Sequence, residues 1–170
     1  MTTIFELIDA GDAEGVRRLV AADPTAAEAR DEDGLSPIVH VAYRGRDELV
    51  TVLPVLDGWD RIFAGEAEDL PAPDAWSPDG FTPLHLAAFA HNTEAARRLL
   101  ASGADPNVVA RSSFARVTPL GTCAFAGATD VARVLLEHGA DPSIAEADAT
   151  TPLAVARANG HDDLVELLSS

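Results

Sequence analysis

The sequence contains no lysine, so all 12 of its basic residues are arginine, against 28 acidic residues and a net charge of −16. Because phosphate binding requires a basic stripe, we expect no nucleic-acid ligand. An acidic body serves solubility or attracts a basic partner, and composition leaves both interpretations open. The complete use of arginine in place of lysine is typical of GC-rich coding, which predicts a bacterial source.

Long hydrophobic runs are also missing. No stretch approaches the roughly 20 apolar residues of a membrane span, and the first residues have no basic region followed by an apolar core. We therefore expect a cytoplasmic protein without a membrane partner. The single cysteine, Cys123, excludes an intramolecular disulfide. Cys123 is expected to be a buried, alanine-like thiol and not a nucleophile, which would need exposure and a neighbouring base.

What the sequence does contain is a repeated Thr-Pro-Leu tripeptide. It stands at 82–84, 118–120 and 151–153, with Ser36-Pro37-Ile38 as a degraded copy, so the prolines are 46, 36 and 33 residues apart. Threonine caps a helix through its side-chain oxygen, and proline suits the first helical position. Glycines at 103, 127, 139 and 160 are placed to end helices in the left-handed conformation.

These motifs, together with His85 and the following Leu-Ala-Ala, resemble the ankyrin repeat, a unit of about 33 residues with a β-turn and two antiparallel helices. The resemblance covers nearly the whole chain. It implies an all-α solenoid of about five helix-turn-helix repeats with short β-turn or hairpin connections. It also implies that His85 hydrogen-bonds a neighbouring turn.

We predict a single domain over residues 1–170, since no repeat buries its apolar face alone. The first and last repeats carry polar residues where internal repeats are apolar, so we interpret them as caps and expect a complete domain. The expected repeats are 1–30, 31–56, 77–110, 113–145 and 146–170, with an insertion at 57–76. In the second repeat, Pro54 falls late in the second helix and is expected to break it.

The insertion combines aromatic and acidic residues. Trp59 and Phe63 have one-turn spacing, which predicts a short amphipathic turn that packs back on the solenoid. An acidic, proline-rich run follows, and we expect an extended loop that is mobile from 64 to 74. Two interpretations stay open: a binding loop, with Trp59 and Trp76 as possible contacts, or a neutral lengthening with Trp59 and Phe63 as local core.

No residue pattern indicates catalysis, a cofactor or a metal site. The five histidines fall in different places without metal-ligand spacing, and no glycine-rich loop is suited to phosphate. We therefore expect no enzyme activity. A small hydrolase, with a pocket made of the insertion and the turn before the fourth repeat, is the remote alternative.

Recognition is expected at the turn tips and on the exposed positions of the first helices, the surface that the resemblance implies. Tyr43, Phe89 and Phe125 share one register position and are predicted to form an exposed ladder along the concave face. Alternatively, these rings pack against turn stems. The predicted partner-binding residues are Leu35, Tyr43, Arg44, Phe81, Phe89, Arg111, Phe114, Arg116, Val117 and Phe125.

The resemblance thus implies a monomeric protein-protein interaction module that binds a partner protein through its concave face and turn tips. The alternative is an acidic inhibitor or immunity-type protein that masks a basic effector.

Overall fold

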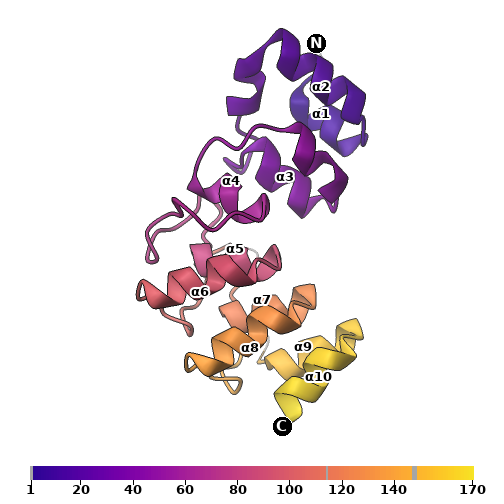
Figure 1. Ribbon diagram of the computed structural model, residues 1–170. Helices are drawn as coiled ribbons and strands as arrows, with labels where there is room; N and C mark the ends of the chain where they lie inside the picture. The colour runs from indigo at the N-terminus through magenta and orange to yellow at the C-terminus, as the bar shows by residue number, and fades with distance from the viewer. Residues whose placement is uncertain (1, 114, 147–148) are drawn as a thin grey trace.

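The computed structural model describes residues 2–113, 115–146 and 149–170, and it consists of stacked helix pairs (Figure 1). Within these residues there are no strands, so the expected all-α class is confirmed. The first helices of the pairs are α1 (Ile4–Asp9), α3 (Pro37–Tyr43), α5 (Pro83–Phe89), α7 (Pro119–Ala126) and α9 (Pro152–Asn159). The second helices are α2 (Ala13–Ala22), η2 (Asp47–Val52), α6 (Thr93–Ala101), α8 (Thr129–Glu137) and α10 (Asp162–Ser169). A 3-10 helix, η1 (Pro24–Glu28), follows α2.

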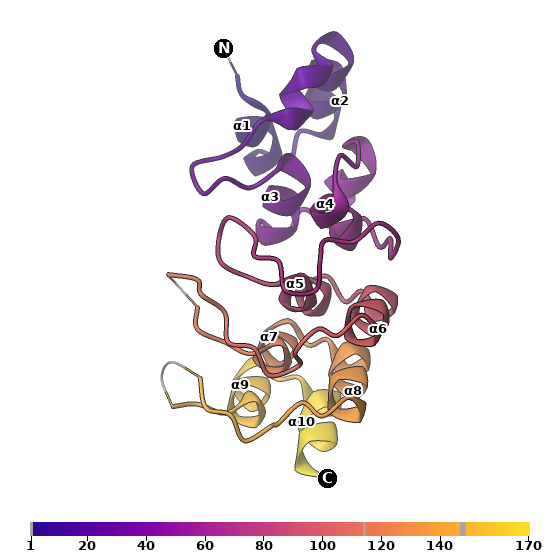
Figure 2. The same cartoon turned by 90° about the vertical axis from the view of Figure 1, so that its left-hand side faces the viewer.

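The pairs stack into two layers, which Figure 2 shows side by side. In the C-terminal part, α7 packs between α5 and α9 in one layer, and α8 packs between α6 and α10 in the other. In the N-terminal part, α1 contacts α3 and α2 contacts η2. Each layer therefore grows by addition of one helix per repeat, as a solenoid requires.

The helix boundaries follow the local signals in the sequence. The Thr118 side chain accepts a hydrogen bond from the Gly121 N–H (3.1 Å), and the helix ends at Gly127 with φ of +77°. The Thr151 side chain caps α9 in the same way, and that helix ends at Gly160 with φ of +73°. A residue with a side chain would be strained in this left-handed region, which explains why glycine stands at the C-terminal end of both α7 and α9.

The second repeat departs from this regular pattern. We expected Pro54 to break its second helix, and regular structure does end before Pro54, with residues Asp47–Val52 as a 3-10 helix. Leu49 is nevertheless completely buried, so the segment keeps its place in the second layer. The proline lacks an N–H to continue the helix, which accounts for the early end.

The insertion contributes a helix of its own, α4 (Gly58–Phe63), which packs against both α3 and α5. Both ribbon views place α4 between these two parts of the solenoid (Figures 1 and 2). Ile62 is completely buried, and Trp59 and Phe63 pack against the core. This arrangement supports the interpretation of the insertion as local core.

Asn92, the N-cap of α6, fixes the C-terminal end of α4. Its Nδ2 donates to the carbonyl oxygens of Ile62 (3.0 Å) and Glu66 (2.7 Å), while its Oδ1 accepts from the Ala95 N–H (3.0 Å). Ala67 and Leu70 then pack against the core. Residues 64–74 form neither helix nor strand, in agreement with the expected loop, and their predicted mobility stays a prediction.

Asp60 joins α4 to the start of α3. Its carboxylate accepts hydrogen bonds from the Ser36 hydroxyl and from the Leu56 N–H (3.0 Å), and the side chain is buried. Burial raises the pKa of this carboxyl above its ordinary value. The insertion therefore replaces a direct repeat-to-repeat junction with a helix that is bonded to both sides.

The hydrophobic core is divided into two clusters at the insertion. One cluster of buried residues extends from Ile62 through α5 to Leu164, and the other extends from Ile4 to Leu53. Phe63 packs against both clusters.

Candidate partner-binding groove

An apolar groove of about 530 Å³ lies along α5, α7 and α9 and the turns that precede them. Its apolar walls include the side chains of Phe81, Leu86, Phe89, Val117, Phe125 and Val155. A concave, largely apolar surface of this size with a few polar groups is the usual form of a binding site.

The predicted aromatic ladder is present only in part. Phe125 is 63% exposed, as expected for a surface ring. Tyr43 and Phe89 are only half-exposed, so the expectation of three exposed rings was wrong for these two. Their ring centroids lie 5.2 Å apart in an edge-on arrangement, and Phe63 of α4 joins them at 6.2 and 6.4 Å.

Two contacts explain this partial burial. The insertion helix brings Phe63 onto the rings, which the register of the repeats alone does not reveal. The Tyr43 hydroxyl also donates to Asp79 Oδ2 (2.7 Å) in the next turn. Burial and this neighbouring carboxylate raise the pKa of Tyr43, so the phenol stays neutral.

Leu35 and Phe81 were expected to be exposed at turn tips, and this expectation was wrong because both are buried, at 6% and 7% exposure. The Phe81 N–H donates to Ser77 Oγ (3.0 Å), and the Phe81 ring lies 5.7 Å from the His85 ring. The last residue of the turn, Phe81, thus packs against His85 of the following helix, α5. Val117, at the equivalent turn end, is half-buried and lines the groove.

The predicted arginine contacts are distributed over several surfaces. The Arg111 guanidinium lies 3.9 Å from the ring centroid of Trp76, so these two predicted residues pair with each other. Arg44 Nε lies 3.1 Å from Asp9 Oδ1. Arg116 is exposed, and Trp59 is half-buried against the core. Phe114 lies outside the described residues.

His85 has the structural role that the resemblance implied. Its Nε2 donates to the Val117 carbonyl oxygen (3.0 Å), so Nδ1 must accept from the Thr82 hydroxyl (2.8 Å). Burial lowers the pKa of His85 to about 4, which keeps the ring neutral. Cys123 is completely buried, as predicted, and burial raises the pKa of its thiol.

Sequence reasoning missed Glu146, the only carboxylate among the described residues that line the groove. Its Oε1 is buried without a hydrogen-bond partner among those residues. Burial raises the pKa of this carboxyl from 4.5 to about 7.

A signal for Glu146 was present in the sequence. Gly121 follows Thr118 by three residues, as His85 follows Thr82, so a glycine stands where the motif has its histidine. A Cβ at position 121 would overlap the Glu146 carboxylate. The missing side chain therefore makes the space that Glu146 occupies.

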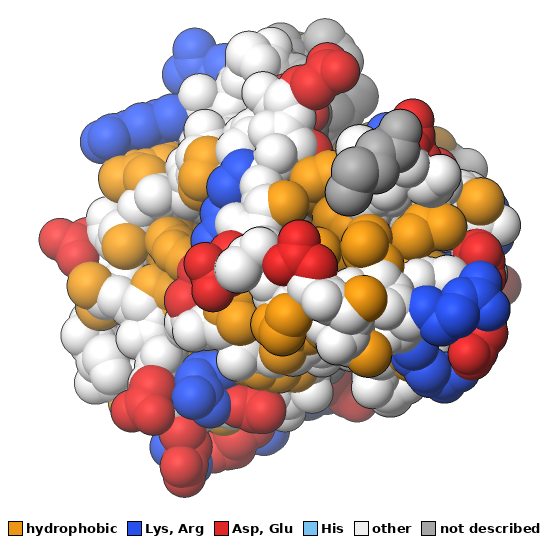
Figure 3. All heavy atoms as spheres, turned by 90° about the horizontal axis from the view of Figure 1, so that it is seen from above, with side chains coloured by type: hydrophobic (Ala, Val, Ile, Leu, Met, Phe, Trp, Pro, Cys, Tyr) orange, Lys and Arg blue, Asp and Glu red, His pale blue; other side chains and the backbone are white. Residues whose placement is uncertain are grey.

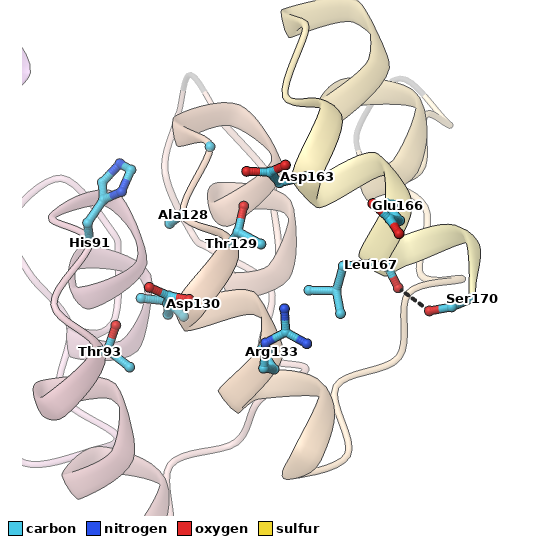
Figure 4. Close-up of a pocket in the computed structure, with 12 residues that line it drawn as sticks. His91, Thr93, Ala128, Thr129, Asp130, Arg133, Asp163, Glu166, Leu167 and Ser170 are labelled. Carbon is cyan, nitrogen blue, oxygen red and sulfur yellow. Dashed lines mark hydrogen bonds between the residues drawn. The ribbon is translucent and has the colours of Figure 1, made fainter.

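A second hollow, of about 600 Å³, lies across α8, α10 and the residues before α6 (Figure 4). Figure 4 shows Asp130 of α8 on the side toward His91 and Thr93, and Arg133 of α8 pointing toward Leu167 of α10. Charges of both signs line this hollow, and among the described residues its apolar side chains are Ala128, Val131 and Leu167 only, fewer than those of the groove.

Acidic side chains are dispersed elsewhere as well. On the face in Figure 3 they lie at several separate places, some beside arginines. No three His, Cys, Asp or Glu side chains among the described residues are grouped to hold a metal ion. Nor does any helix within the described ranges have the length and apolar character to cross a membrane.

Comparison with known families agrees with the repeat architecture. A model of three ankyrin repeats matches residues 4–110, and a model of a single ankyrin repeat matches residues 116–146. No significant match to a curated protein was found. Ankyrin repeats are generally protein-protein interaction modules and typically non-catalytic, and no catalytic family was detected. The chain belongs to the ankyrin-repeat family.

Proposed function

We propose that this protein binds a segment of a partner protein in the apolar groove along α5, α7 and α9. The observation that carries the proposal is the position of Phe125, a large aromatic side chain that is 63% exposed on a wall of that groove. Exposed aromatic rings bury much area at low entropic cost when a partner arrives, which makes them frequent hot spots.

The surroundings of Phe125 favour a binding role over a purely structural one. The half-buried Phe89 and Val155 line the groove with it, so a partner side chain on Phe125 would contact a continuous apolar surface. The walls are also held in place, because Phe89 packs on Tyr43 and Tyr43 is bonded to Asp79. A preformed site loses less conformational entropy on binding.

The experiment is replacement of Phe125 by alanine. Wild-type protein and variant are first used to capture a partner from a lysate of the native host, which is identified by mass spectrometry. The purified partner is then titrated calorimetrically. We expect Phe125→Ala to weaken binding by about 2 kcal/mol, roughly 30-fold, while unfolding changes little because the ring is mostly exposed.

Val109→Ala is the matched control. Val109 is another exposed apolar residue, at 38%, but it does not line the groove. Its replacement should leave affinity unchanged within twofold. Equal affinity of wild-type protein and Phe125→Ala for the partner would show that binding occurs elsewhere.

Inhibition of a basic effector is the second candidate, favoured by the net charge of −16. Dispersed charge acts mainly by steering, so the association rate would then fall steeply as salt is added. Binding centred on the groove would depend mainly on Phe125.

A further inference from the structure

Among the described residues that line the groove, one buried side-chain oxygen has no hydrogen-bond partner. Glu146 Oε1 is buried, yet no described residue donates a hydrogen bond to it. In the preceding repeat the equivalent space holds His85, whose ring bonds to the Val117 carbonyl oxygen. At Gly121 that ring is absent, and the Glu146 carboxylate rests against the bare backbone.

An unpaired buried carboxylate destabilises a fold. A buried acceptor without a donor costs about 1–3 kcal/mol, and more when it is charged. Asp79, the acidic residue beside the Tyr43 ring, has its hydrogen bonds satisfied, because it accepts from the Tyr43 hydroxyl and from the Ser77 hydroxyl. Glu146 therefore differs from Asp79 in needing a donor that the described part of the chain does not supply.

We propose that Glu146 receives an arginine or lysine side chain of the partner, whose neighbouring apolar side chain packs on Phe125 and Phe89. This inference rests on the proposed function and specifies the partner chemistry: a short segment in which a basic residue stands beside apolar residues.

The chemistry of the groove favours a single cationic side chain as the occupant. Glu146 is the only carboxylate among the described lining residues, too few ligands for a metal ion. An anionic ligand would be repelled by it and by the net charge of −16. A guanidinium or ammonium group would instead pair with the carboxylate in a partly desolvated site, where such bonds are strong.

The apolar walls specify the remainder of the segment. Phe125 and Val155 line the same groove as Glu146. A basic residue paired with Glu146 thus brings its neighbours onto apolar surface, which a fully polar basic segment would not exploit.

The test uses a phage-displayed library of random dodecapeptides, selected on the wild-type protein. The selected peptides are synthesised and titrated calorimetrically. We expect them to share an arginine or lysine beside apolar residues. Glu146→Gln, which keeps the shape and removes the charge, should weaken their binding at least tenfold.

Glu137→Gln is the matched control, because it changes the net charge equally at an exposed position of α8 that does not line the groove. It should leave affinity unchanged within twofold. Binding should also tighten between pH 6 and pH 8 as Glu146 loses its proton. The other titratable groups that line the groove are Tyr43 and His85. Both stay neutral between pH 6 and pH 8, because the pKa of Tyr43 is raised and that of His85 is about 4.

The outcomes separate this inference from the proposed function. Peptides that lack a basic residue, or that bind Glu146→Gln as well as wild-type protein, would overturn the role of Glu146. If such peptides still lose affinity in Phe125→Ala, the groove remains the binding site. If no peptide is enriched, or if the selected peptides ignore both substitutions, the proposed function fails as well.

Discussion

Replacement of Glu146 by glutamine should stabilise the protein at alkaline pH. The carboxyl has an ordinary pKa of 4.5 and a folded-state pKa of about 7. A raised folded-state pKa means that this group's contribution to stability is complete below pH 4.5 and is lost as the pH rises through about 7. The full difference corresponds to about 3 kcal/mol.

Solvent reduces that value because the side chain is only partly buried. We therefore expect Glu146→Gln to raise the free energy of unfolding by about 1–2 kcal/mol at pH 8, and to change it little at pH 4.5. The reason is that glutamine, like the protonated acid, brings no charge into the site.

The assay is urea denaturation at both pH values, followed by circular dichroism and by tryptophan fluorescence. Both tryptophans, Trp59 and Trp76, lie in the insertion, so agreement of the two signals tests whether the divided core unfolds as one unit. Glu137→Gln controls for the reduced net charge. Equal stabilisation at both pH values, or destabilisation at pH 8, would refute the assignment of Glu146 as an unsatisfied carboxylate.

Two further predictions concern buried groups. Cys123 should not react with a bulky thiol reagent until denaturant is added, and rapid labelling of the native protein would contradict its burial. Cys123→Leu should destabilise the fold by about 1–3 kcal/mol through overpacking, whereas Cys123→Ala should cost less. Asn92→Ala removes a helix cap and both bonds to the insertion, so it should cost about 2–4 kcal/mol and speed limited proteolysis within residues 64–74. Asn92→Asp keeps the capping oxygen but not the two donors, so a stability equal to wild type would show that the bonds to Ile62 and Glu66 are unimportant.

Local sequence determined the repeat. The threonine side chains cap helices, and Gly127 and Gly160 end them in the left-handed conformation, because these preferences depend on a few adjacent residues. The burial of Cys123 and the role of His85 followed from motif position, since every repeat packs the same face against its neighbours.

Contacts between distant residues decided the structure of the insertion. The spacing of Trp59 and Phe63 predicted a short turn that packs back on the solenoid, and α4 does pack against α3 and α5. The acidic, proline-rich run after it was expected only as an extended loop, yet Ala67 and Leu70 pack against the core. The bonds from Asn92 and the burial of Ile62 come from residues about 30 positions apart. No local propensity encodes such contacts, and these contacts also decide that Tyr43 and Phe89 are half-buried.

The groove depended on tertiary structure for the same reason. The sequence identified Phe125 as an exposed ring, because its register position is fixed within one repeat. It also contained Gly121 in place of a histidine, but the consequence became visible only when folding brought Glu146 of the next repeat into that space. The burial and missing partner of a carboxylate are properties of its surroundings, and these are assembled from separate repeats.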